Sequence, residues 1–372
     1  MINPDPDAVV WVRCAGPAQL AVLPALAARL QSEGEAVRLV ATLPAGDAAA
    51  HGVAANPVSS KDAMAFLTGL RPIMVLWAGG QLDAAILRAT ASGQVPLVLV
   101  DMAADALSQL RRRLFFGSLR KNIARLHAVF ARDEAAAQAF RTAGADPVAT
   151  IAVGLLEDPP AVLPYDEDDR RTLSEALGNR PVWLATQVRV ADVDDLAKAQ
   201  RHAARRAHRL MLAVIPATPE DAVPIARRFA ELGFPVICRT ETPTPEDATQ
   251  IMVGDADDEI GLWLRVSPVT FAGGTLTKSA AQDPFTVAAL GSVLVHGPAT
   301  DPFAARYARL FAARATFPIV GIADLGAAIE DLLAPDKVAT MATAGWDVTS
   351  RGAETTDRMI RLIRDRLDAV GL

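Results

Sequence analysis

The sequence predicts an α/β protein made of two doubly wound parallel sheets, one after the other along the chain. Short apolar, β-branched runs alternate with longer stretches rich in Ala, Leu and Arg, which is the pattern of βαβ units. A proline-containing acidic stretch at 159–170 interrupts this alternation, which then begins again. A length of 372 residues accommodates two domains of about 100–200 residues each. We therefore expect domains over 1–158 and 171–350, a linker over 159–170, and a C-terminal helix over 351–372.

The individual elements follow from apolar runs and from helical spacing of three and four. Strands are expected over 9–12, 37–42, 73–77, 95–100, 128–131 and 151–153, and then over 181–185, 209–215, 236–239, 251–254, 269–272 and 292–296. Helices are expected over 18–32, 82–91, 134–143, 192–208, 225–232, 285–290, 302–314, 325–333 and 353–372. Ligands of such sheets bind beyond the carboxyl ends of the strands, so the loops after strands are the candidate site loops.

Composition excludes several classes of protein. The net charge is −6 and the pI about 5.5, which argues against a nucleic-acid binder. No apolar run reaches the ~18 residues of a membrane span, and residues 1–7 lack the features of a signal peptide. The two cysteines, Cys14 and Cys238, are far apart, and the five histidines have no partner at metal-ligand spacing. We therefore expect no metal and no cofactor.

In the first half, two loops and one carboxylate qualify as site candidates. Gly16 to Gln19 follows the first strand and opens a helix, where free N–H groups favour an anion or a polar ligand. Gly79-Gly80 is a similar loop, and Asp101 ends the buried strand 95–100. The alternatives are ordinary turns for the two loops and a helix cap for Asp101.

In the second half, Gly273, Gly274 and Thr275 follow the strand 269–272. Two glycines allow backbone N–H groups to approach a phosphate closely, so a nucleotide-phosphate site is predicted, with Lys278 as a nearby positive charge. The segment from Gln282 to Thr286 opens the next helix, whose N-terminus also suits an anion.

A basic and aromatic stretch lies between residues 111 and 125. It contains Arg111, Arg112, Arg113, Arg120 and Lys121 beside two phenylalanines. Such a pattern suits an anionic membrane surface or a phosphorylated lipid; the alternative is a solvated helix face.

Four segments resemble the 3-deoxy-D-manno-octulosonic acid (Kdo) transferases of lipopolysaccharide synthesis. Residues 253–262 resemble the family's GDTMGELGL and keep Glu259, residues 271–276 resemble FVGGSL, residues 288–298 resemble AALGVPVLFGP, and residues 131–145 resemble AQSEEDAERFRALGA. The resemblance implies a GT-B arrangement, in which two Rossmann-like domains face a cleft and the final helix packs back on the first domain. It also implies an inverting transferase with the nucleotide sugar on the second domain and the acceptor on the first.

The same comparison shows substitutions at family positions. Gln19 stands where the family has the SVGE glutamate regarded as the general base, and Thr286 stands where a glutamate is expected to hold the ribose. An amide cannot accept a proton near neutral pH, so Asp101 and Asp83 are the remaining base candidates. Gly273, Gly274, Thr275, Glu259, Gln282 and Thr286 are the predicted donor-site residues.

The sequence thus favours a divergent glycosyltransferase of Kdo-transferase type. Its donor would be a nucleotide sugar, CMP-linked by resemblance, and its acceptor an anionic lipid or lipid A-like molecule faced by the basic stretch. The expected location is the cytoplasm, with peripheral attachment to the membrane left open. The alternative is a catalytically silent paralogue that binds a glycolipid or a protein.

Overall fold

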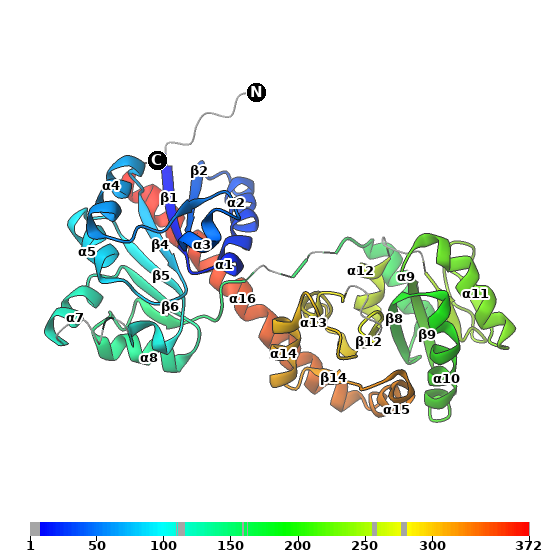
Figure 1. Cartoon of the computed structure of the whole chain (residues 1–372). Coiled ribbons are helices and arrows are strands. Elements are labelled where there is room, and N and C mark those ends of the chain that lie inside the picture. Colours follow the sequence, from blue (N-terminus) through cyan, green and yellow to red (C-terminus); the bar gives the residue numbers. More distant parts are fainter. Residues whose placement is uncertain are drawn as a thin grey trace, which may run out of the picture. The chain divides into compact units, whose positions relative to one another are not determined.

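The computed structural model describes residues 8–108, 110, 116–157, 160–161, 163–254, 259–276 and 281–371. The chain divides into two compact units (Figure 1). Unit 1 consists of Met1–Pro159 and Arg351–Leu372, and unit 2 consists of Pro160–Ser350. Each unit contains one seven-stranded sheet, and all strand pairings in both sheets are parallel. The predicted α/β class with two doubly wound sheets is therefore confirmed.

The sheet of unit 1 has the order β3-β2-β1-β4-β5-β6-β7. Its strands are β1 (Ala8–Cys14), β2 (Val37–Leu43), β3 (Ala54–Ala55), β4 (Met74–Ala78), β5 (Leu97–Met102), β6 (Ala128–Ala131) and β7 (Thr150–Ala152). Its helices are α1 (Pro17–Ala21), α2 (Leu23–Ser32), α3 (Ala45–Ala48), α4 (Ser60–Leu70), α5 (Ala84–Ser92), α7 (Phe116–Ile123) and α8 (Glu134–Ala143). The strand order reverses between β1 and β4, which is where such sheets bind ligands.

The sheet of unit 2 has the order β10-β11-β9-β8-β12-β13-β14, which differs from that of unit 1 because β11 lies between β9 and β10. Its strands are β8 (Val182–Val188), β9 (Met211–Pro216), β10 (Val236–Cys238), β11 (Ile251–Val253), β12 (Val269–Ala272), β13 (Val293–His296) and β14 (Thr316–Pro318). Its helices are α9 (Glu167–Leu177), α10 (Val193–Ala204), α11 (Ala222–Glu231), α12 (Ile260–Val266), α13 (Pro284–Ala289), α14 (Ala304–Ala312), α15 (Leu325–Asp331) and the first part of α16 (Pro335–Val370). Here the order reverses between β8 and β12.

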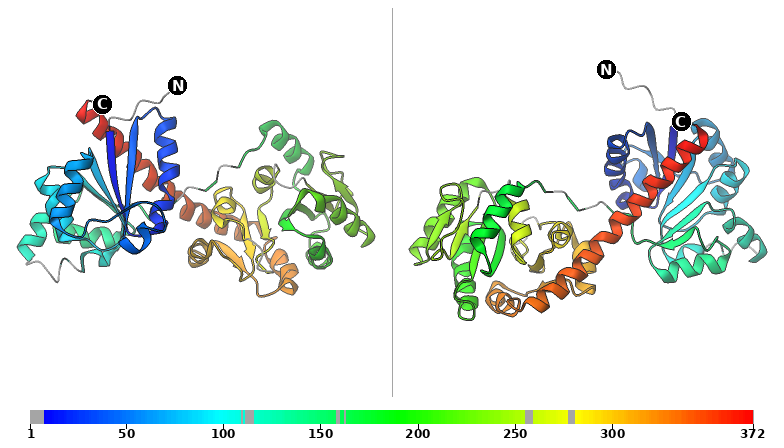
Figure 2. Two further views of the ribbon diagram at one scale, coloured as in Figure 1. Left: turned by 45° about the horizontal axis from the view of Figure 1, so that its top comes forward. Right: turned by 180° about the vertical axis from the view of Figure 1, so that it is seen from behind.

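Both faces of each sheet are covered by helices, which explains the continuous apolar runs in the strands. In unit 1, Trp11 and Trp77 pack beneath α4, α5 and α8, whereas the opposite face packs against α2 and the end of α16. That end of α16 is red in Figure 2 and lies against the sheet of unit 1. In unit 2, Trp183 and Trp263 belong to the cores on opposite faces of the sheet.

Several expectations about helices were wrong or incomplete. The helix expected over 18–32 is two helices that meet at Val22, because Pro24 has no N–H to continue the ladder of the first. The last helix begins at Pro335 rather than at 353. Gly345 in this helix packs closely on Ala288, because an added Cβ would lie 3.2 Å from the Cβ of Ala288. Helices α3, α4, α7, α9 and α12 were not expected, and α9 begins at Glu167, inside the predicted linker 159–170. Helix α12 shows no amphipathic period because most of it is buried.

Candidate functional sites at the carboxyl edges of the two sheets

In unit 1, three side chains from separate strand ends meet at the carboxyl edge of the sheet. Gln19 lies in α1 after β1, Asp101 lies at the end of β5, and Arg132 directly follows β6. Gln19 Nε2 donates to Asp101 Oδ2 at 2.9 Å. Arg132 donates from Nε to Asp101 Oδ1 at 2.7 Å and from Nη2 to Oδ2 at 3.3 Å. Both oxygens of this carboxylate, which is 2% exposed, are therefore engaged.

The backbone is shaped to bring these groups together. Asp101 has a φ of 58°, a left-handed conformation that is costly for a residue other than glycine. The register between β5 and β6 shifts between Leu99 and Met102, as at a β-bulge, which re-aims a side chain. Gly79, with φ of 70°, leaves room for the pair: an added Cβ would lie 3.2 Å from Gln19 Nε2 and 3.3 Å from Asp101 Oδ2. Asp101 is thus part of a built polar cluster, and it caps no described helix.

The second base candidate, Asp83, lies on the next loop of this edge. Its Oδ1 accepts from the N–H of Ala85 at 2.5 Å and so caps α5. The guanidinium of Arg13 stacks 4.2 Å from the centre of the Trp77 ring. Burial lowers the pKa of Arg13 to about 10, and the charge of Asp83 opposes this shift. Arg13 therefore stays a cation at neutral pH.

Arg13 and Arg132 were not recognised as site residues from the sequence. Within the described part of the chain, Arg13 Nε and Nη1 are buried without a hydrogen-bond partner. The pKa of Arg132 is raised, mainly by its hydrogen bond to Asp101. Both arginines could have been found from their positions at the carboxyl ends of strands. Arg13 is the next-to-last residue of β1, and Arg132 follows the last residue of β6.

In unit 2, the glycine loop follows β12 as expected, but its residues have structural roles. A Cβ on Gly273 would lie 2.1 Å from the carbonyl oxygen of Thr186, so the loop requires glycine to pack on β8. Gly274 has a φ of 79°. The buried Thr275 hydroxyl donates to the carbonyl of Ala272 at 2.7 Å and accepts from the N–H of Gly297 at 2.8 Å. This hydroxyl therefore joins the loops after β12 and β13.

Glu259 belongs to a largely buried ionic network. Its carboxylate pairs with Arg239, which is 8% exposed and also pairs with Asp169. The other carboxylate oxygen accepts from Trp263 Nε1 at 3.2 Å. A Cβ on Gly254 would lie 2.6 Å from this oxygen, so Gly254 and the Glu259 carboxylate are in close contact.

The remaining predicted donor residues surround the start of α13. Gln282 Oε1 accepts from the Thr186 hydroxyl at 2.8 Å, and Thr286 is buried within α13. The N-terminus of this helix is capped by Asp283, whose carboxylate accepts from the N–H of Phe285 at 3.1 Å and pairs with Arg306. The expected anion position at this helix start is therefore taken by the chain's own carboxylate.

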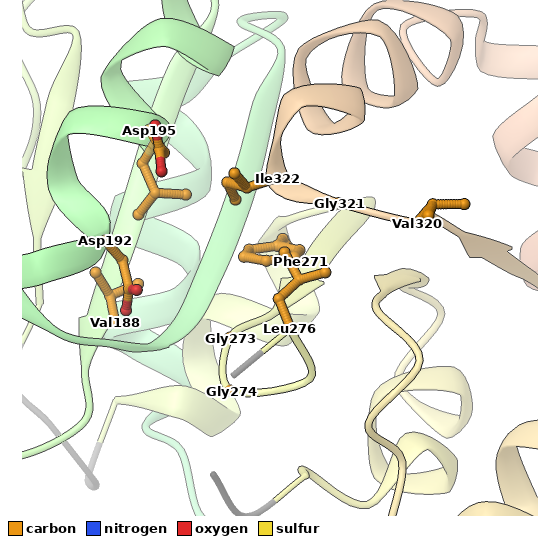
Figure 3. A pocket seen from close by; sticks show the side chains of 11 residues that line it. Val188, Asp192, Asp195, Phe271, Gly273, Gly274, Leu276, Val320, Gly321 and Ile322 are labelled. Carbon is orange, nitrogen blue, oxygen red and sulfur yellow. The ribbon is translucent and has the colours of Figure 1, made fainter. Parts of the chain in front are cut away.

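A cavity of about 280 Å³ lies at the carboxyl edge of the second sheet (Figure 3). Its lining comes from the ends of β8 and β12, the first turn of α10 and the loop after β14: Val188, Asp192, Asp195, Leu196, Phe271, Gly273, Gly274, Leu276, Val320, Gly321 and Ile322. Two of the predicted donor residues, Gly273 and Gly274, thus border a cavity. The structure places Thr275, Glu259, Gln282 and Thr286 in the contacts described above rather than in its lining.

Other predicted positions are only partly covered by the structure. Arg111, Arg112, Arg113 and Lys278 lie outside the described residues. Arg120 and Lys121 are exposed on α7. Among the described side chains, no group of three or more His, Cys, Asp and Glu is arranged to hold a metal ion. No described helix is both long enough and apolar enough to span a membrane.

Comparison with known proteins identifies sequence relatives and solved structures that this chain resembles. No family model matches the chain. A 3-deoxy-D-manno-octulosonic acid transferase of Haemophilus influenzae is 25% identical over 203 residues, which are 54% of this chain and 47% of the relative. The match thus spans about half the length of that curated relative.

Among solved structures, the C-terminal CMP-Kdo binding domain of WaaA from Acinetobacter baumannii aligns with a TM-score of 0.45 and 19% identity, covering 49% of this chain and 96% of that domain. MurG of the same organism aligns with a TM-score of 0.48 and 14% identity over 96% and 99% of the two chains. A UDP-N-acetylglucosamine 2-epimerase from Listeria monocytogenes, described as putative, aligns with a TM-score of 0.42 and 14% identity over 97% of each chain. The sequence match confirms that this chain resembles the Kdo transferase family, over about half of its length.

Proposed function

We propose that this protein is a divergent glycosyltransferase that uses a nucleotide-sugar donor and a lipid or lipopolysaccharide-type acceptor. The observation that carries the proposal is the 203-residue sequence match to a 3-deoxy-D-manno-octulosonic acid transferase. Unit 2 would hold the donor at the carboxyl edge of its sheet, beside Gly273 and Gly274. Unit 1 would hold the acceptor at the equivalent edge, and the basic residues near 111–121 would face an anionic lipid.

The two candidate bases differ in what they could do. Asp101 is buried and engaged by Gln19 and Arg132, so it suits the positioning of these two side chains. Asp83 is only half-buried and uses one oxygen to cap α5. Since a general base must come within hydrogen-bond reach of the acceptor hydroxyl, we assign the base role to Asp83.

The function is tested by binding and then by transfer. The full chain is screened by thermal shift with CMP-, UDP- and GDP-linked sugars, and each stabilising donor is incubated with lipid A-type acceptors while products are followed by mass spectrometry. A donor present at 100 times its Kd is expected to add about 2.7 kcal/mol to the free energy of unfolding. The expected result is transfer from a stabilising donor and its loss in Asp83→Asn, with donor binding retained.

Transfer of Kdo itself is expected to be weak, because Thr286 stands where the resemblance implies a glutamate that holds the ribose. Loss of the base in Asp83→Asn should lower transfer from a stabilising donor by about 10²–10⁴-fold. Donor binding without any transfer would overturn the transferase and support the silent binding paralogue. Robust transfer that survives Asp83→Asn would leave the transferase standing but remove Asp83 from the base role.

A further inference from the structure

The cavity of unit 2 is lined by acidic side chains, which is unexpected for a phosphate site. Asp192 and Asp195 line it from the start of α10. Among the described residues of its lining there is no Lys, Arg or His. Lys198 is a cation near the cavity. Its side chain is 73% exposed, and its Nζ pairs with Asp195 at 2.7 Å. A phosphate in this cavity would therefore meet two carboxylates.

Backbone N–H groups around the cavity are also already used. The N–H of Gly273 donates to the carbonyl of Thr186 at 3.0 Å. The N–H groups of Val320 and Gly321 both donate to Asp324 Oδ2, at 3.2 and 3.1 Å. Phosphate sites at strand-to-helix turns depend on free N–H groups, and here three of them are satisfied by the chain itself.

The two sides of the cavity suit a different kind of group. Figure 3 shows Asp192 and Asp195 on one side and Phe271, Leu276 and Ile322 across from them. Carboxylates accept hydrogen bonds from hydroxyl groups, and vicinal hydroxyls can donate to them together. An apolar wall suits the face of a planar or saturated ring. The volume of about 280 Å³ lies just below the usual range of ligand cavities, about 300–1,000 Å³, so it suits one nucleoside rather than a whole nucleotide sugar.

We propose that this cavity binds the uncharged nucleoside part of a ligand, and that the phosphate lies outside it. The ribose 2′- and 3′-hydroxyls would donate to Asp192 Oδ1 and Asp195 Oδ2, beside the contacts of the other oxygens with the Arg189 N–H and with Lys198. This inference rests on the proposed donor role of unit 2. The ribose would then be recognised by the first turn of α10. It would not be recognised at position 286, where this chain has a buried threonine.

The test is calorimetric titration of the full chain with cytidine and uridine, their 2′-deoxy counterparts, and inorganic phosphate. We expect at least one ribonucleoside to bind and its 2′-deoxy form to bind about tenfold more weakly. Asp195→Asn keeps the shape but removes the charge and should weaken ribonucleoside binding by about tenfold. The control is Asp194→Asn on the same turn, whose carboxylate pairs with Arg228 on the surface; it should change binding by less than about twofold.

A second variant blocks the cavity. Gly321 has an extended backbone, with φ of −151°, and no heavy atom lies within 4 Å of an added Cβ. The substitution Gly321→Val should therefore leave the thermal midpoint within about 2 °C of the parent. Because Gly321 lines the cavity, the added side chain should crowd a bound ribonucleoside and weaken its binding. Ribonucleoside binding that is unchanged in this variant would show that the ligand lies elsewhere.

Several outcomes would overturn the inference. These are equal binding of the 2′-deoxy form, tighter binding by Asp195→Asn, and displacement of the nucleoside by inorganic phosphate. If nucleotides bind but Asp195→Asn leaves ribonucleoside affinity unchanged, this inference fails and the proposed function stands. If nucleosides bind as expected but no sugar is transferred, the proposed function fails and this inference stands. If no nucleoside or nucleotide binds, both fail.

Discussion

At the residue scale, the side-chain amide of Gln19 is the hydrogen-bond donor that the buried Asp101 carboxylate needs. Gln19 Nε2 donates to a carboxylate that also takes two hydrogen bonds from Arg132. A glutamate at this position has no donor to offer Asp101 when it is ionised. A glutamate introduced at position 19 would therefore place two carboxylates against each other beside Arg132.

The first prediction follows from this contact. In Gln19→Glu, two carboxylates would lie at hydrogen-bond distance, so the pKa of the introduced carboxyl would rise. Its folded value then exceeds its unfolded value, so stability is retained at low pH and lost as the pH rises through the folded value. We expect the variant to lose about 1–3 kcal/mol relative to the parent at pH 8 and much less at pH 5, as measured by urea unfolding.

The matched control is the double variant Gln19→Glu with Asp101→Asn, which restores one amide donor facing one carboxylate. It should recover most of the loss at pH 8. A single variant as stable as the parent at both pH values would show that the two side chains do not interact in solution.

His296 is a second residue whose surroundings lead to a measurable effect. It is 7% exposed, its Nδ1–H donates to the carbonyl of Gly297 at 2.8 Å, and its ring lies edge-on to Tyr307 at 4.7 Å. Its Nε2 is buried and, within the described residues, has no hydrogen-bond partner. Burial lowers the pKa of His296, because the charged imidazolium is poorly solvated there.

This predicts a loss of stability on acidification. A lowered folded pKa means that the unfolded chain binds the proton first, so stability falls as the pH drops below the unfolded value of 6.5. His296→Phe keeps a ring against Tyr307 and removes the titration. We expect the variant to gain about 1 kcal/mol relative to the parent between pH 7 and pH 5. Parallel pH profiles of the two proteins would contradict this account.

At the element scale, α16 contributes to both units. Near its start, Val338 and Met341 pack into a core of unit 2, and near its end Ile363 and Leu367 pack into a core of unit 1. Arg364 pairs with Glu33 and Glu35 beside α2. Those exposed pairs contribute little, so the apolar side chains attach the helix end to unit 1.

The third prediction tests this attachment. Ile363 is fully buried, and Ile363→Ala should reduce the free energy of unfolding by about 2–4 kcal/mol, because it removes packed methyl groups and leaves a cavity. Arg361→Ala on the exposed face of the same helix is the control and should cost under about 0.5 kcal/mol. Equal effects of the two substitutions in denaturant unfolding would show that the helix end does not pack as described.

At the scale of the whole molecule, the two units have separate apolar cores. The buried clusters of unit 1 and those of unit 2 share no residue, although α16 supplies residues to both. Each unit is large enough to bury a core of its own. We therefore expect local openings to follow the two units.

The fourth prediction uses hydrogen exchange followed by mass spectrometry. Phe229→Ala in unit 2, where Phe229 is fully buried, should cost about 3–5 kcal/mol and reduce protection in β8 and β9. Protection in β1 and β4 should stay within about a factor of three of the parent. Ile363→Ala should give the reverse pattern. A loss of protection of similar size in both sheets would show that the chain opens as one cooperative unit.

Much of the fold could be predicted because its signals are local. The strands at 128–131 and 269–272 and the helix at 134–143 have the predicted bounds, since their apolar runs and caps are complete within the segment. Helix α12 was missed because burial on several sides removes the amphipathic period. The early start of α16 was missed although its buried residues Val338, Met341 and Thr349 recur at helical spacing. The roles proposed for the donor residues and for Asp83 stay predictions.

The sequence by itself determined the two α/β units, the loops at the carboxyl ends of their strands and the resemblance to the Kdo transferases. Hydrophobic periodicity and motifs depend only on residues that are close together in the sequence. Only the tertiary structure decided which side chains meet. Asp101 faces Gln19 and Arg132 because the segments after β1, β5 and β6 meet at one edge of the sheet, where the register between β5 and β6 shifts. Asp192 and Asp195 line a cavity with Gly273 because the start of α10 and the end of β12 border the same space. Such contacts join residues tens of positions apart, and their geometry depends on strand order and register, which no local pattern specifies.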